Sequence, residues 1–141
     1  MARYLVVANL TLGGEQLLAT VRDRAAAGDA EIHVLVPASS GASWHAHDED
    51  SDVRLAHERL QHAIEQFSEL GVEVTGEVGD FRPIEAIGDV LRREPPFDEI
   101  ILSTLPSGPS KWMRMDLPRR VERAYDVPVT HVVGAARTPA G

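Results

Sequence analysis

The chain has 141 residues, with 14 lysines and arginines against 22 aspartates and glutamates, so its formal net charge is −8 at pH 7. This charge disfavours non-specific binding to nucleic acid. The lack of cysteine excludes disulfides, thiolate metal sites and a cysteine nucleophile. The length suits a single domain with a sizeable core. No apolar run approaches the roughly 20 residues that span a bilayer, and the N-terminus lacks a signal-peptide pattern, so we expect a cytoplasmic protein with no membrane partner.

The first part of the chain predicts a strand, a helix and a second strand. The apolar run Tyr4–Ala8 predicts a buried strand, followed by a turn at Asn9–Gly14. Apolar residues then recur at helical spacing between Leu17 and Ala25. The run Ile32–Val36 predicts a second buried strand, which Pro37 ends.

A long polar stretch, Ala38–Asp52, predicts a loop before the most regular helix. That helix has a single apolar stripe, formed by Ala56, Leu60, Ala63, Ile64, Phe67 and Leu70. The loop holds His45, His47 and the acids at 48–50, which are oxygen and imidazole donors of the kind that divalent ions take. Because these residues are contiguous, we expect a solvated loop and assign no metal site.

The second half of the chain predicts three more strands and two more helices. Val72–Val78 alternates apolar and polar residues, with Glu73 and Glu77 on one face, which is typical of an edge strand. A helix opens at Pro83, and the run Ile100–Leu102 predicts a fourth buried strand. The remaining elements are a helix that begins at Leu117 or just before it because of Pro118, and a fifth strand at Pro128–Val133.

Strands that alternate with helices predict an α/β fold: a three-layer sandwich with a five-stranded parallel sheet and helices on both faces. We expect one domain over residues 1–134 and a flexible tail over 135–141. Two strand orders fit, 2-1-3-4-5 and 3-2-1-4-5. The acidic face of Glu73 and Glu77 favours 3-2-1-4-5, because that order places the third strand at an edge.

Ligands of such sheets bind at the carboxyl ends of the strands, where the strand order reverses. In the order 3-2-1-4-5 this point lies between the loops after the first and fourth strands. Lys111 and Arg114 stand near the start of the helix that follows the fourth strand, and that position favours an anion. The ligand-binding residues that we predict are Ala8, Asn9, Pro37, Ser103, Thr104, Ser107, Gly108, Ser110, Lys111 and Arg114. No residue is assigned a catalytic role.

The layout resembles the universal stress protein family over nearly the whole chain. The resemblance rests on the N-terminal strand Tyr4–Ala8, the polar loop before a long second helix, the stretch from Gly79-Asp80 to Ile87, and Asp126-Val127-Pro128-Val129 at the start of the last strand. It implies a sheet of order 3-2-1-4-5, a homodimer formed through the fifth strand, and ATP or AMP as a ligand.

The resemblance also has a clear departure in the phosphate-binding motif. ATP-binding members carry a spaced set of glycines after the fourth strand, ending in Gly and Ser or Thr. With the motif started at Ser103, Pro106 and Asp116 replace the second and third glycines, and Leu117 replaces the hydroxyl residue. Asn9 stands where the family has an acid. The chain therefore resembles a divergent member that lacks the glycine ATP-binding motif.

Taken together, the resemblance implies a cytoplasmic binding or regulatory domain of the stress response. We expect weak binding of a nucleotide or small anion in the crevice between the loops after the first and fourth strands, and no catalysis. The alternative is a metal-dependent nucleotide hydrolase or phosphotransferase of the related α-hydrolase-like group. For the metal and base of that reaction the sequence offers Asp80, Asp116 and the cluster at 45–50.

Overall fold

The computed structural model describes residues 1–38, 48–105, 112 and 116–134, without the side chains of 48–52. One parallel sheet of order β3-β2-β1-β4-β5 organises the chain, which confirms the predicted fold class and strand order. The strands are β1 (Ala2–Val7), β2 (Ala30–Pro37), β3 (Glu73–Gly79), β4 (Glu99–Thr104) and β5 (Val129–Val133). The helices are α1 (Glu15–Ala26), α2 (Asp48–Ser68), α3 (Pro83–Arg93) and α5 (Leu117–Ala124).

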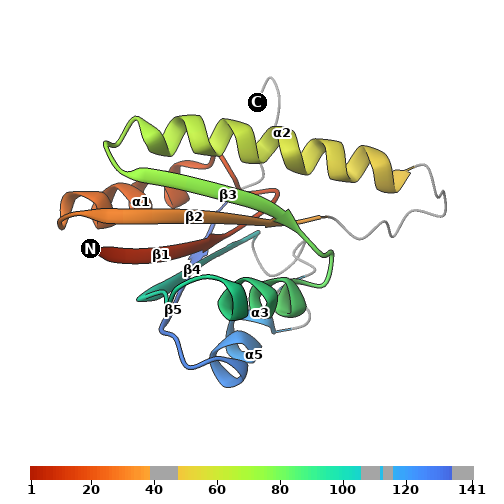
Figure 1. Ribbon diagram of the computed structural model, residues 1–141. Helices are drawn as coiled ribbons and strands as arrows, with labels where there is room; N and C mark the ends of the chain where they lie inside the picture. The colour runs from red at the N-terminus through yellow and green to blue at the C-terminus, as the bar shows by residue number, and fades with distance from the viewer. Residues whose placement is uncertain (39–47, 106–111, 113–115, 135–141) are drawn as a thin grey trace.

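The helices form two layers, with α1 and α2 over one face of the sheet and α3 and α5 over the other (Figure 1). Each layer encloses its own apolar cluster because successive strand residues point to opposite faces. In β1, Val6 belongs to the cluster under α1 and α2, whereas Leu5 and Val7 belong to the cluster under α3 and α5. This is why the predicted central strands appear in the sequence as continuous apolar runs.

The start of α2 differs from the prediction. We expected a loop as far as Asp52, but the helix already begins at Asp48. A helix N-terminus favours negative charge, so the acidic run at 48–50 suits a first helical turn better than a loop. The start of α5 agrees with the prediction, because the helix begins at Leu117 with Pro118 in its first turn.

The edge position of β3 is also confirmed, and the polar face of this strand is anchored to its neighbour. His33 of β2 is buried, and its Nδ1 and Nε2 lie 2.7 Å from Thr75 Oγ1 and 2.8 Å from Glu77 Oε2. Burial opposes ionisation of Glu77, but hydrogen bonds from Arg93 and His33 outweigh it and hold the pKa of Glu77 below its ordinary value. Polar contacts therefore fix a strand that has a neighbour on one side only.

Among the residues that the structure describes, no helix combines the length and the apolar character needed to cross a membrane. Residues 135–141, which we expect to form a tail, lie outside the described part.

Candidate functional site

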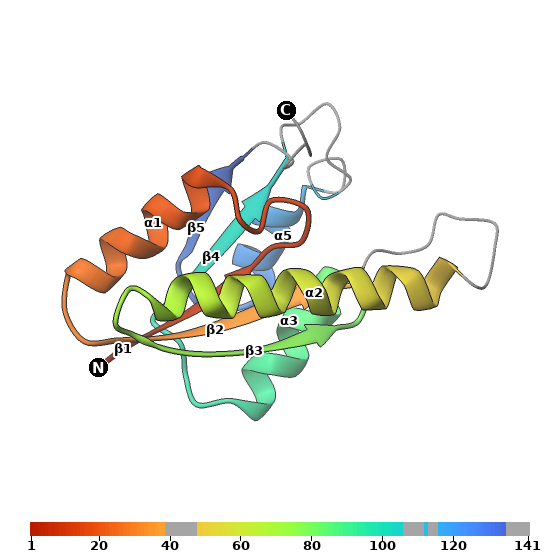
Figure 2. The same cartoon turned by 90° about the horizontal axis from the view of Figure 1, so that it is seen from above.

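The loops that follow β1 and β4 meet at the carboxyl end of the sheet. Thr11 of the first loop and Ser103 near the end of β4 are both buried, and their hydroxyl oxygens lie 2.5 Å apart. These strands are neighbours in the centre of the sheet, while the crossovers from them lead to opposite sides. Figure 2 shows the loop between β1 and α1 at this end of the sheet, near α2. The predicted switch point is therefore present.

Asn9 is the polar centre of the loop after β1. Its side chain is almost fully buried, and its Nδ2 donates to the carbonyl oxygen of Pro37 at 2.8 Å. Its Oδ1 accepts a hydrogen bond from Arg59 Nη1, also at 2.8 Å. Ala8, before it, is buried and donates its backbone N–H to Leu35 at 3.3 Å. The amide of Asn9 thus ties the ends of β1 and β2 to α2.

Arg59 and Thr11 also contact the predicted residues of this site, although neither was predicted from the sequence. Arg59 lies on α2, three residues after Ala56 and four before Ala63, both of which belong to the apolar stripe. A residue at that spacing lies at the border of the stripe, where a long side chain can reach the sheet edge. Spacing alone could have identified Arg59 as a border residue but not Asn9 as its partner.

The two predicted residues at the end of β4 use their hydroxyl groups within the protein. Ser103 is bonded to Thr11, and the Thr104 hydroxyl donates to the carbonyl of Leu105 at 2.9 Å. His131 Nε2 lies 2.7 Å from the same Thr104 hydroxyl oxygen. Because the hydroxyl has only one proton and gives it to Leu105, His131 Nε2 is the donor in this contact. Burial lowers the pKa of His131, so its ring is neutral at pH 7 and adds no positive charge to the site.

The remaining predicted residues lie outside the described part of the chain: Ser107, Gly108, Ser110, Lys111 and Arg114. The structure brings together Ala8, Asn9 and Pro37, and joins them through the loop after β1 to Ser103. Trp112, which the structure does describe, packs against the apolar cluster under α3 and α5.

Within the described residues, no group of three or more His, Cys, Asp or Glu side chains could hold a metal ion. The side chains of the histidine and acid cluster at 45–50 lie outside that part. The described site therefore contains one amide, three hydroxyls and one guanidinium, from Asn9, Thr11, Ser103, Thr104 and Arg59. The amide and the hydroxyls have hydrogen-bond partners within the protein, whereas the guanidinium uses one of its five N–H donors on Asn9, and its other donors can bind an anion.

No family model matches the sequence, and no curated protein matches it. Solved structures do match. The universal stress protein from Archaeoglobus fulgidus is 16% identical, with a TM-score of 0.66 over 94% of this chain and 93% of that chain. A structure of the universal stress protein from Archaeoglobus fulgidus in complex with dAMP gives 18% identity and a TM-score of 0.65, over 94% of this chain and 97% of that chain. A universal stress protein family protein from Arabidopsis thaliana with AMP bound is 16% identical, with a TM-score of 0.60 over 99% and 97%.

These matches cover almost the full length of both chains, and they confirm the predicted resemblance at the level of the fold. The chain has the fold of the universal stress proteins.

Proposed function

We propose that this chain is a universal stress protein-like binding domain that takes an adenine nucleotide, or another small phosphate-bearing anion, between the loops after β1 and β4. The observation that carries the proposal is the junction of these loops through Thr11 and Ser103 at the switch point. Two neighbours of the same fold have AMP or dAMP bound. By the same resemblance we propose a regulatory role in the cytoplasm.

The binding that we propose needs no chemistry on the ligand. In the described site the hydroxyls of Ser103 and Thr104 are engaged in internal hydrogen bonds, and neither is paired with a carboxylate that could serve as a base. The ligand is then held and released, and its presence alters the surface around the carboxyl end of the sheet.

Ligand-induced thermal stabilisation tests the proposal. ATP, AMP and cyclic AMP are added separately, with and without magnesium, to the full chain. A ligand at about 100 times its dissociation constant stabilises the folded state by about 2.7 kcal/mol, which raises the melting temperature by several degrees. We expect a shift with at least one nucleotide and a smaller shift for Lys111→Ala. If no nucleotide or phosphate alters melting, the proposal is wrong, and turnover of a nucleotide with a metal ion favours the hydrolase alternative.

We also propose a homodimer that forms through β5. This strand ends the sheet, so the backbone groups along its outer side have no strand partner within the described chain. Val133 at its end is 47% exposed, which adds apolar surface to that edge.

Sedimentation velocity tests the dimer. We expect the mass of two chains for the wild type and a shift toward one chain for Val133→Lys, because a charge at that edge opposes strand pairing. Val53→Lys is the matched control, since Val53 is 40% exposed on α2 and should leave the mass unchanged. A wild-type chain that sediments as a monomer at micromolar concentration contradicts the proposal.

A further inference from the structure

Arg59 differs from every other arginine that the structure describes. Five arginines form ion pairs with carboxylates: Arg3, Arg24, Arg82, Arg92 and Arg93. The other described arginines without such a pair, apart from Arg59, are exposed on helix surfaces: Arg22, Arg54, Arg119, Arg120 and Arg123. Arg59 alone in this part of the chain is half-buried and has no carboxylate partner. A partly buried guanidinium that is held by a neutral acceptor keeps its positive charge available to an anion.

We infer that Arg59 binds the phosphate group of the ligand, and that Asn9 holds the guanidinium in place without neutralising it. The inference rests on the proposed function. It adds the position of the positively charged side chain that binds the phosphate within the site. The phosphate then sits on the α2 side, next to the end of β1, with Arg59 as a cationic contact.

The geometry around Asn9 explains how the pair works. Because Asn9 Nδ2 donates to Pro37, the amide is oriented and its Oδ1 faces Arg59. One N–H of the guanidinium is used by this neutral acceptor, while a guanidinium carries five N–H donors. The remaining donors can form the two parallel hydrogen bonds with which arginine binds a phosphate. An aspartate at position 9 would instead pair with Arg59 and cancel its charge.

The surroundings of Arg59 favour an organic phosphate over the free ion. Leu55 lies four residues before Arg59, one turn away on the same side of α2, and is 44% exposed. Leu10 follows Asn9 directly and is 45% exposed. These two exposed leucines, one on α2 and one next to Asn9 in the chain, offer apolar surface to the non-phosphate part of a ligand such as a nucleoside monophosphate.

The test separates the phosphate from the rest of the ligand. Isothermal titration calorimetry at fixed ionic strength measures the binding of AMP, adenosine and inorganic phosphate to four proteins: the wild type, Arg59→Gln, Asn9→Asp and Arg22→Gln. The last variant is a control, because Arg22 is exposed on α1 and its replacement changes the net charge equally. Thermal melts verify that each variant is folded.

We expect the wild type to bind AMP about tenfold or more tightly than adenosine, the scale of one charge-assisted interaction. Inorganic phosphate should bind more weakly than AMP. The ratio of the affinity for AMP to the affinity for adenosine should fall toward one in Arg59→Gln and in Asn9→Asp. In Arg22→Gln this ratio should stay at the wild-type value. Asn9→Asp adds the acid typical of the family, so tighter AMP binding by this variant would overturn the inference.

Other outcomes are equally decisive. An unchanged preference in Arg59→Gln overturns the inference and leaves the proposed function standing, because AMP still binds. A preference lost equally in Arg22→Gln shows a general charge effect and also overturns it. A wild type that binds neither AMP nor adenosine contradicts the proposed function itself.

Discussion

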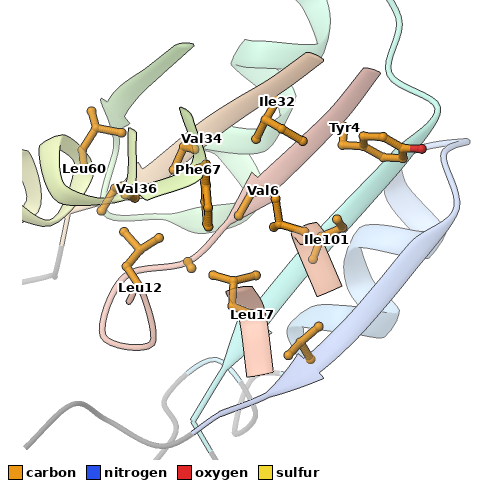
Figure 3. Close-up of a cluster of buried hydrophobic side chains, with 14 of the residues drawn as sticks. Tyr4, Val6, Leu12, Leu17, Ile32, Val34, Val36, Leu60, Phe67 and Ile101 are labelled. Atoms are coloured by element: carbon orange, nitrogen blue, oxygen red, sulfur yellow. The ribbon is translucent and has the colours of Figure 1, made fainter. Parts of the chain in front are cut away.

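Replacement of Phe67 by alanine is expected to lower the free energy of unfolding by about 3–5 kcal/mol. Phe67 lies on α2, is fully buried, and is the largest of the fully buried side chains of the described chain. Figure 3 shows its ring beside Val6 of β1 and Val34 of β2. Alanine would leave a cavity between α2 and the sheet, because closely packed neighbours relax only in part.

Urea denaturation at pH 7 measures this loss. Phe67→Leu keeps most of the side-chain volume, so it should lower the free energy of unfolding clearly less than Phe67→Ala does. Val53→Ala on the same helix is the control, because Val53 is exposed and its truncation should change stability by about 0.5 kcal/mol or less. A loss below about 1 kcal/mol for Phe67→Ala would contradict the packing of α2 on the sheet described above.

The second large effect concerns Glu99 at the start of β4. Arg24 of α1 donates to both of its carboxylate oxygens, from Nε at 2.7 Å and from Nη2 at 2.8 Å, and Thr130 of β5 also donates to it. The Arg24 hydrogen bond, partly opposed by burial, holds the pKa of Glu99 below its ordinary value. The carboxylate thereby joins α1, β4 and β5 in one network.

A lowered pKa in the folded state fixes the sign of the pH effect. The stabilisation by Glu99 is fully present above the ordinary carboxyl pKa and is lost as the pH falls through the lower folded value. We expect Glu99→Gln to lower the free energy of unfolding by about 2 kcal/mol at pH 7. This is less than the loss expected on breaking a fully buried ion pair, because the side chains of Arg24 and Glu99 are both partly exposed. Below pH 4 the difference in the free energy of unfolding between the variant and the wild type should become smaller.

Chemical denaturation between pH 3 and pH 7 checks this prediction. Glu58→Gln on α2 is the control, since Glu58 is exposed and forms no ion pair within the described residues. Curves of stability against pH that run parallel for the wild type and Glu99→Gln would show that Glu99 does not titrate as described.

The proposed ligand site differs in kind from these stabilising features. Glu99 and Arg24 neutralise each other, whereas Asn9 holds Arg59 through a neutral amide. The first arrangement stabilises the fold. The second leaves a positive charge that can bind an anion, which is why we assign it to the ligand.

The sequence by itself determined the architecture, because burial leaves a periodic signature. The continuous run Ile100–Leu102 marks a strand covered on both faces, and the acids Glu73 and Glu77 mark an edge. Pro118 marked the start of α5 because its ring permits only the first turn of a helix. These are local properties, and local sequence carries them.

Only the tertiary structure decided the contacts of the site. Arg59 and Asn9 are separated by 50 positions, and Thr11 and Ser103 by 92. Whether such side chains meet depends on where packing places α2 and the two central strands, and no periodicity encodes that distance. For the same reason the hydroxyls of Ser103 and Thr104, which resemble open ligands in the sequence, prove to be bonded inside the protein.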